Sequence, residues 1–168
     1  MNIKKSTNKI FKNIFLNEKC LEIEGGQLLK GKIKISGAKN SALVLMAASI
    51  LSRGQINLFN VPQISDVLVM SKILTALGIN IKSNRDHLKI KTQEISPPSE
   101  DLFFDLFNSL RVSFFCIGPL LARFGKAKVP LPGGCSIGSR PIDEHINSLK
   151  ELGVIFQLKN NYLSAEVI

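Results

Sequence analysis

The chain has 168 residues, of which 45% are hydrophobic and 21% are charged, and its formal net charge is +9. This composition predicts one globular domain with its own core and excludes two large domains. No stretch of about 18 uninterrupted apolar residues occurs, so we expect no membrane span. With one Tyr and no Trp to stack on bases, the positive charge does not indicate nucleic-acid binding. Anionic small substrates account for it equally well.

The cysteines and histidines predict free thiols and no metal centre. Cys20, Cys116 and Cys135 lack C-x-x-C spacing and do not form a disulfide framework. His87 and His145 lie far apart in the sequence, so we expect no zinc site. Free thiols fit a reducing compartment, which favours the cytoplasm. We also expect no cofactor.

Residues 1–20 form a basic extension rich in Lys and Asn. The composition predicts a solvated, poorly ordered tail. A transit peptide is the alternative, because the segment is poor in acids and carries apolar residues at helical spacing; the location would then be the plastid stroma. No apolar core of a secretory signal follows the charges.

The first half of the remaining chain alternates between strand and helix patterns. Residues 21–26 and 32–36 read as two short strands joined by a turn at Gly25-Gly26. Ser65 is placed to cap a helix that Gly78 ends. The predicted elements that follow the strands are a helix (36–54), a strand (55–61), a helix (64–78), a hairpin (79–92) and a loop (93–101).

The second half repeats this order. Its predicted elements are a helix (109–125), a strand running into a loop (126–134), a helix that begins with Pro141 (141–153) and a hairpin (154–168). Superimposing the halves brings Lys39 onto Arg111 and Asp66 onto Asp143. We therefore predict that one strand-helix-strand-helix-hairpin unit occurs twice, at about 31–95 and about 105–168 within a partial domain at 21–168.

The superposition places a cation at the start of the first helix in both units. Lys39 and Arg111 face the unpaired N–H groups and positive dipole of a helix N-terminus, which is locally unfavourable. A bound phosphate or carboxylate would relieve this repulsion. A side chain that reaches into water would relieve it too, and the spacing does not decide between the two readings.

The loop from Pro132 to Pro141 predicts a reactive cysteine. Its glycines and prolines make regular structure improbable and let the backbone approach a ligand. Cys135 is expected to be accessible beside Arg140, as a thiolate or poised thiol. Cys116, inside an apolar helix, is expected to be a core thiol.

The helix after the loop has two readings. Asp143 and Glu144 fall in its first turn, where acids simply stabilise a helix start or else contact a polar ligand. His145 follows them, and we interpret it as a structural or substrate-orienting residue.

Three motifs carry a resemblance to the enolpyruvyl transferase family. Residues 36–43, 110–125 and 132–143 resemble, in order and spacing, the branch that acts on UDP-N-acetylglucosamine. The resemblance implies an α/β fold of two inside-out barrel domains, each built from three βαβαββ repeats, with about two repeats present here. It also implies transfer of the enolpyruvyl group of phosphoenolpyruvate to the 3′-hydroxyl of UDP-N-acetylglucosamine, the first committed step of peptidoglycan synthesis.

The resemblance also implies roles for individual residues. Cys135 matches the loop cysteine that donates a proton, forms an adduct with phosphoenolpyruvate and is alkylated by fosfomycin. Lys39 matches a contact to phosphoenolpyruvate and Asn40 a contact to the sugar nucleotide, whereas Arg111 and Arg140 match arginines that hold anionic groups. The stretch against the uridine part comprises Arg140, Pro141, Ile142, Asp143 and Glu144.

The chain departs from the family in length. It is well under half as long, and the family's general-base aspartate has no counterpart in it. We therefore expect the chain to be inactive without a C-terminal half. The alternatives are a non-catalytic sugar-nucleotide-binding module or pseudoenzyme, and the sister transferase acting on shikimate 3-phosphate, which lacks the loop around Cys135.

Overall fold

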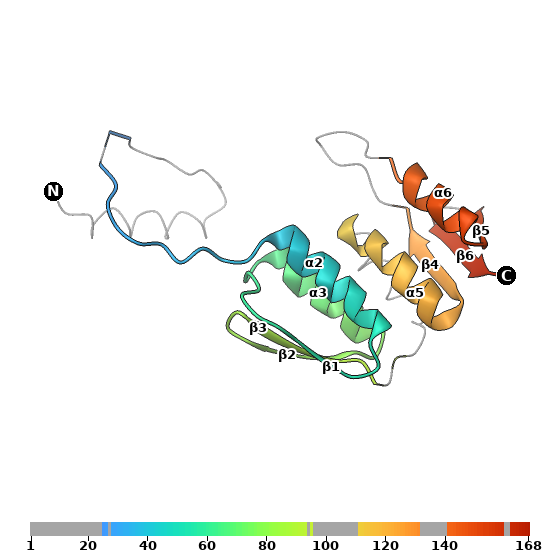
Figure 1. The fold of residues 1–168 in the computed structure, drawn as a ribbon, viewed down its shortest axis with the longest axis horizontal. Coiled ribbons are helices and arrows are strands. Elements are labelled where there is room, and N and C mark those ends of the chain that lie inside the picture. Colours follow the sequence, from blue (N-terminus) through green and yellow to red (C-terminus); the bar gives the residue numbers. More distant parts are fainter. Residues whose placement is uncertain (1–24, 27, 94, 96–110, 132–140, 160–161) are drawn as a thin grey trace, which may run out of the picture. The chain divides into compact units, whose positions relative to one another are not determined.

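The computed structural model describes residues 25–26, 28–93, 95, 111–131, 141–159 and 162–168 (Figure 1). The chain divides into two compact units, Met1–Lys34 and Ile35–Ile168. Residues 1–20, for which we predict a tail or a transit peptide, lie outside the described part.

The strand predicted at residues 32–36 is wrong. These residues adopt neither helix nor strand, and the side chains of Ile33 and Ile35 are 90% and 82% exposed. Alternation of apolar and polar residues selects a face, but a strand also needs a neighbour to complete its hydrogen-bond ladder. No strand of the described residues pairs with this segment.

Every described helix and strand belongs to the second unit. In chain order they are α2 (Lys39–Ala48), the 3-10 helix η1 (Ser49–Leu51), β1 (Gln55–Leu58), α3 (Ser65–Ala76), β2 (Asn80–Asn84), β3 (His87–Lys91), the 3-10 helix η2 (Arg111–Cys116), α5 (Ile117–Phe124), β4 (Lys126–Pro130), α6 (Asp143–Glu151), β5 (Val154–Lys159) and β6 (Tyr162–Val167).

The two halves of this unit form sheets of the same topology. The strand order is β1-β3-β2 in the first sheet and β4-β6-β5 in the second, and all pairs are antiparallel. In both sheets the last strand of the hairpin lies in the middle. The predicted repetition of helix, strand, helix and hairpin is therefore confirmed among the described residues.

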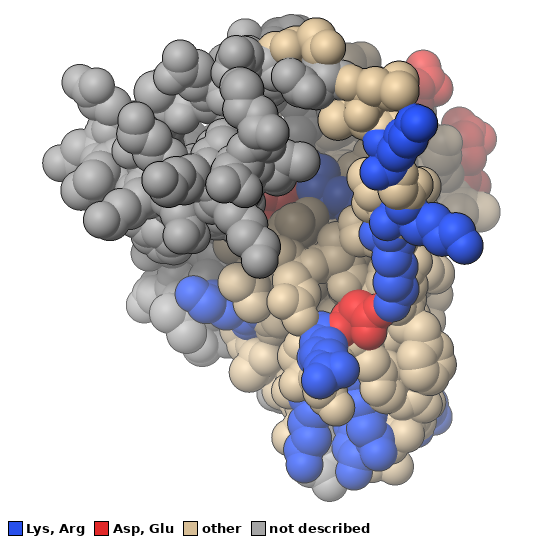
Figure 2. All heavy atoms as spheres, turned by 90° about the vertical axis from the view of Figure 1, so that its left-hand side faces the viewer, with Lys and Arg blue, Asp and Glu red and all other residues tan. Residues whose placement is uncertain are grey.

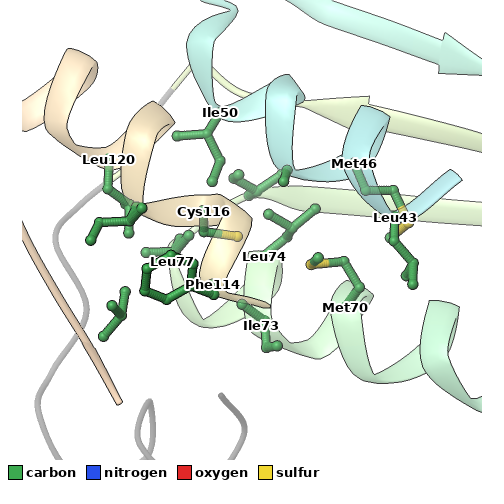
Figure 3. Packing of buried hydrophobic residues seen from close by; sticks show 14 of the residues in the cluster. Leu43, Met46, Ile50, Met70, Ile73, Leu74, Leu77, Phe114, Cys116 and Leu120 are labelled. Carbon is green, nitrogen blue, oxygen red and sulfur yellow. The ribbon is translucent and has the colours of Figure 1, made fainter. Parts of the chain in front are cut away.

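One hydrophobic core joins the halves (Figure 3). Leu43 and Met46 of α2 and Met70 of α3 are completely buried. Phe114 and Cys116 of η2 belong to the same buried cluster, which makes the helix layer continuous from one repeat to the next. Packing of this kind supplies most of the stability of a domain of this size.

Arg123 of α5 ties the second repeat to the first. Its guanidinium donates to the carbonyl oxygens of Ile50 (3.2 Å), Ser52 and Thr92 (3.1 Å). The Thr92 hydroxyl donates to the carbonyls of Ser52 (2.9 Å) and Gly54 (3.0 Å). A planar cation thereby donates to carbonyl groups at the end of η1 and just after β3.

The ends of two helices differ from the sequence prediction. Ile64 occupies the cap position of α3, whereas Ser65 is its first helical residue and makes no cap bond. The helix α6 begins at Asp143, not at Pro141, and Ile142 is its cap residue. The predicted stop at Gly78 is confirmed, because that residue has a φ of 82°, which favours glycine.

The outer face of the first sheet is basic. Lys82 of β2 lies directly opposite Lys89 of β3, and Lys91 follows on the same face. Figure 2 shows several Lys and Arg side chains among the described residues of the face that it draws. Of the described helices, none has the length and apolar content needed to cross a membrane.

Candidate active site

Lys39 opens α2, as the sequence predicts. Its cap residue, Ala38, offers no side-chain acceptor, and the first turn of the helix contains no acid. The first backbone N–H groups of α2 therefore receive no hydrogen bond acceptor from the side chain of the cap residue. The helix dipole adds positive charge beside the Lys39 ammonium. Asn40 follows Lys39 in the helix and is exposed.

Gly37 fixes where this helix starts. Its N–H donates to the carbonyl oxygen of Asn60 at 3.0 Å, and a Cβ on Gly37 would lie 2.0 Å from that oxygen. Only glycine permits this approach of two backbone segments. Asn60 itself has a φ of 56°, which an asparagine tolerates better than most residues. The motif that begins at Ser36 thus places Lys39 through a backbone contact.

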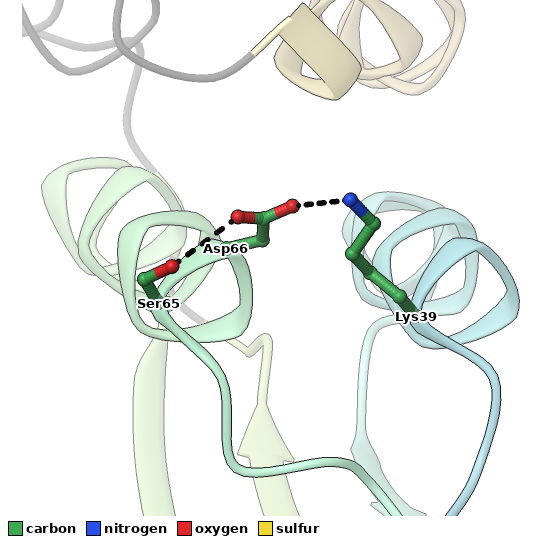
Figure 4. A network of polar contacts seen from close by, with 3 residues as sticks. All are labelled: Lys39, Ser65 and Asp66. Atoms are coloured by element: carbon green, nitrogen blue, oxygen red, sulfur yellow. Dashed lines mark hydrogen bonds and ion pairs between the residues drawn. The ribbon is translucent and has the colours of Figure 1, made fainter. Parts of the chain in front are cut away.

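Asp66 pairs with Lys39. The ammonium Nζ lies 2.9 Å from Asp66 Oδ2, and the side chains are 52% and 29% exposed. The Ser65 hydroxyl donates to Asp66 Oδ1 over 3.4 Å (Figure 4). Asp66 lies in the first turn of α3, so the pair joins the N-terminal ends of two neighbouring helices.

The other predicted site residues lie in the second repeat. Arg111 is the first residue of η2, and its side chain is outside the described part. Asp143 and Glu144 occupy the first turn of α6 and are exposed. Pro141 is exposed, whereas Ile142 is partly buried against the core.

Glu144 also borders a shallow pocket of about 340 Å³ between the helices of the second repeat. The His145 ring lies edge-on to Phe114, with centroids 6.1 Å apart, and is tilted against Phe115 at 5.7 Å. The remaining lining residues are Ile117, Gly118, Ser148 and Leu149. The lining is mainly apolar, with Glu144, His145 and Ser148 as its polar members, which suits a flat organic ring.

The second half of the chain contains two cysteines, Cys116 and Cys135. Cys135 and Arg140 lie outside the described residues. Cys116 is a free, fully buried thiol, and burial raises its pKa to about 12. The prediction that Cys116 is a core thiol is confirmed.

The helices that carry these residues run in a common direction. In Figure 1 the N-terminal ends of α2, α3, α5 and α6 lie toward the same side of the second unit. Helix N-termini attract anions through their unpaired N–H groups and their dipoles. Among the described residues no group of three His, Cys, Asp or Glu side chains is arranged to hold a metal ion. The arrangement is suited to binding phosphate and carboxylate groups.

Sequence reasoning missed two positioning features. Gly37 belongs to the motif at residues 36–43, but its role depends on the backbone of Asn60, which sequence spacing does not reveal. Asp66 stood out in the superposition of the repeats, where it matches Asp143. That match was the one sign in the sequence that Asp66 belongs with Lys39, the cation at the start of the neighbouring helix.

Comparison with known proteins identifies the family. The sequence model of EPSP synthase (3-phosphoshikimate 1-carboxyvinyltransferase) matches residues 23–168. The chain belongs to the enolpyruvyl transferase family. Members of this family are transferases, so the family prediction from the three motifs is confirmed.

Curated relatives of this enolpyruvyl transferase chain carry a more specific name. UDP-N-acetylglucosamine 1-carboxyvinyltransferase 2 of Prochlorococcus marinus (strain SARG) is 53% identical over 88% of this chain and 35% of the relative. UDP-N-acetylglucosamine 1-carboxyvinyltransferase of Synechococcus sp. (strain CC9605) is 49% identical over 88% of this chain and 34% of the relative. The chain therefore spans about a third of the length of the curated relatives it matches.

Solved structures confirm the fold of this enolpyruvyl transferase chain. The enolpyruvyl transferase NikO from Streptomyces tendae superimposes with a TM-score of 0.71 at 20% identity, over 86% of this chain and 32% of that chain. EPSP synthase from Acinetobacter baumannii gives 0.64 at 17% identity, over 85% and 33%. The predicted α/β class with about two repeats of the inside-out barrel domain agrees with both structures.

Proposed function

We propose that this chain is part of an enzyme that transfers the enolpyruvyl group of phosphoenolpyruvate to the 3′-hydroxyl of UDP-N-acetylglucosamine and releases phosphate. One observation carries the proposal: relatives of that name are identical to this chain at about half of the matched residues. The reaction is the first committed step of peptidoglycan synthesis, so the enzyme supports cell-wall formation, cell shape and division. Its substrates are metabolites of the cell interior, and we place it in the cytoplasm.

The cations of the site account for the choice of phosphoenolpyruvate. This substrate carries a phosphate and a carboxylate, and fixed cations bind both groups and stabilise charge that develops during the reaction. In the proposal Lys39, Arg111 and Arg140 supply these cations. The uncapped start of α2 adds backbone N–H groups beside Lys39, which supports the assignment.

The sugar nucleotide takes the remaining positions. Asn40 is proposed to contact the sugar, and the stretch from Arg140 to Glu144 is proposed to contact the uridine part. The exposed first turn of α6 and the pocket beside Glu144 and His145 support this placement, since an aromatic-lined pocket accommodates a planar base.

Cys135 is the proposed proton donor. Protonation at C3 of phosphoenolpyruvate needs an acid close to the substrate, and a thiol with a tuned pKa can serve. The same nucleophilic sulfur would form an adduct with phosphoenolpyruvate and react with fosfomycin. No cofactor takes part in this chemistry.

The proposal does not assign a general base. Removing the proton of the sugar hydroxyl requires a base, and no residue of this chain matches the family's aspartate. We therefore propose that the chain alone does not turn over and that a C-terminal part completes the site.

A joined enzyme tests the proposal. Residues 23–168 replace the matching segment of the Prochlorococcus relative, and phosphate release from phosphoenolpyruvate is measured with either UDP-N-acetylglucosamine or shikimate 3-phosphate. We expect release with the sugar nucleotide, and loss of at least about a hundredfold in C135S because the acid is removed.

The same assay separates the alternatives. Release with shikimate 3-phosphate alone would assign the chain to the sister transferase, after which the family model is named. A folded joined enzyme that binds UDP-N-acetylglucosamine without releasing phosphate would indicate a non-catalytic binding module. Either result contradicts the proposal.

A further inference from the structure

We propose that Asp66 is a positioning residue that holds the Lys39 ammonium in place for the phosphate of phosphoenolpyruvate. The inference rests on the proposed function and adds to it a residue that lies outside the three motifs at 36–43, 110–125 and 132–143. Asp66 acts through Lys39 and does not itself touch the substrate.

The first argument is conformational. Lysine carries its charge on a flexible stem, and fixing that stem costs side-chain entropy. Asp66 Oδ2 meets Lys39 Nζ at 2.9 Å, and the carboxylate is the more buried partner, with 29% of its side chain exposed. An acid anchored in the first turn of α3 therefore sets the direction in which the Lys39 stem leaves α2.

The second argument is electrostatic. Lys39 stands at a helix N-terminus without an acid in its own first turn, where the dipole repels a cation. Asp66 offsets this repulsion from the neighbouring helix, and its own position at the start of α3 is favourable for a carboxylate. The pair therefore keeps a cation at an anion-binding helix end in the absence of substrate.

The third argument concerns the number of hydrogen bonds that the Lys39 ammonium can donate. An ammonium group can donate several hydrogen bonds at once, so the bond to Asp66 leaves donors for phosphate oxygens. The Lys39 side chain is 52% exposed, which leaves it open to a ligand. The Ser65 hydroxyl occupies the other carboxylate oxygen, Oδ1, at 3.4 Å, so Asp66 has partners on both sides.

The test measures the Lys39 amine directly in the full chain. An amine-reactive ester is applied, and the acylation rate of Lys39, relative to that of Lys91, is followed by mass spectrometry. The variants are D66N, which removes the charge; D66E, which keeps it; and E151Q, a matched loss of charge at the C-terminal end of α6. Relative acylation of Lys39 should rise about threefold to tenfold in D66N, stay near the parent value in E151Q and be largely restored in D66E.

The substrate readout follows from the same experiment. Phosphoenolpyruvate, added with UDP-N-acetylglucosamine, should protect Lys39, and the concentration for half protection should rise about threefold to tenfold in D66N. A merely structural defect would instead raise the acylation of all lysines together. Equal relative acylation and equal protection in D66N and the parent chain would overturn the proposal. Absence of protection in the parent chain, with the D66N change in acylation intact, would count against the proposed function alone.

Discussion

The thiol of Cys116 is enclosed by apolar side chains of the shared core, and burial raises its pKa from 9.0 to about 12. The folded chain therefore holds this proton more tightly than the unfolded chain does. Stability from this difference is fully present below pH 9.0 and is lost as the pH rises toward about 12.

A comparison of the parent chain with C116V tests this linkage, because valine fills a similar volume and does not titrate. The free energy of unfolding, measured in urea at pH 8 and pH 10.5, should fall more with pH in the parent chain than in C116V. Identical pH dependence in both would show that the Cys116 thiol does not titrate differently on unfolding.

Residues of the candidate site illustrate what sequence reasoning can reach. The position of Lys39 at a helix start follows from its place before an Ala- and Leu-rich stretch, and the structure confirms the helix. Its partner Asp66 lies on another helix, and sequence spacing does not give contacts between helices. The role of Gly37 likewise depends on a backbone oxygen of a distant residue, Asn60.

At the scale of elements, Arg123 links the ends of two repeats. Replacing it by Ala removes the donors to three carbonyl oxygens, so R123A should lower the free energy of unfolding by about 2 kcal/mol. The matched control is R53A, which removes an exposed Arg and should stay within about 0.5 kcal/mol of the parent. Equal effects of the two substitutions in a urea titration would show that the carbonyl contacts do not stabilise the chain.

The order of elements could be predicted because both halves carry the same periodic pattern, which local physics translates into helices and hairpins. The exact starts of the helices and the pairing of strands were harder to predict. Ser65 has the chemistry of a cap, yet Ile64 precedes the first turn and Ser65 enters the helix. The segment at 32–36 has the pattern of a strand, but among the described residues it has no partner. Pairing is a property of the whole fold, which a local pattern does not contain.

At the scale of the whole molecule, the two repeats bring a basic helix start and an acidic helix start into one unit with a single core. Lys39 and Asn40 come from the first repeat, and Arg111 and the first turn of α6 come from the second. The repetition thus explains how a chain that spans about a third of its relatives can carry several residues proposed to hold the substrates.

Labelling by fosfomycin tests most directly whether these residues form part of a substrate site. The full chain is treated with fosfomycin, with and without UDP-N-acetylglucosamine, and modified cysteines are identified by mass spectrometry. We predict that Cys135 is modified, that the sugar nucleotide accelerates the modification, and that the buried Cys116 is spared in both conditions. If the sugar nucleotide leaves the rate of Cys135 modification unchanged, the proposal that these residues form part of a substrate site is contradicted.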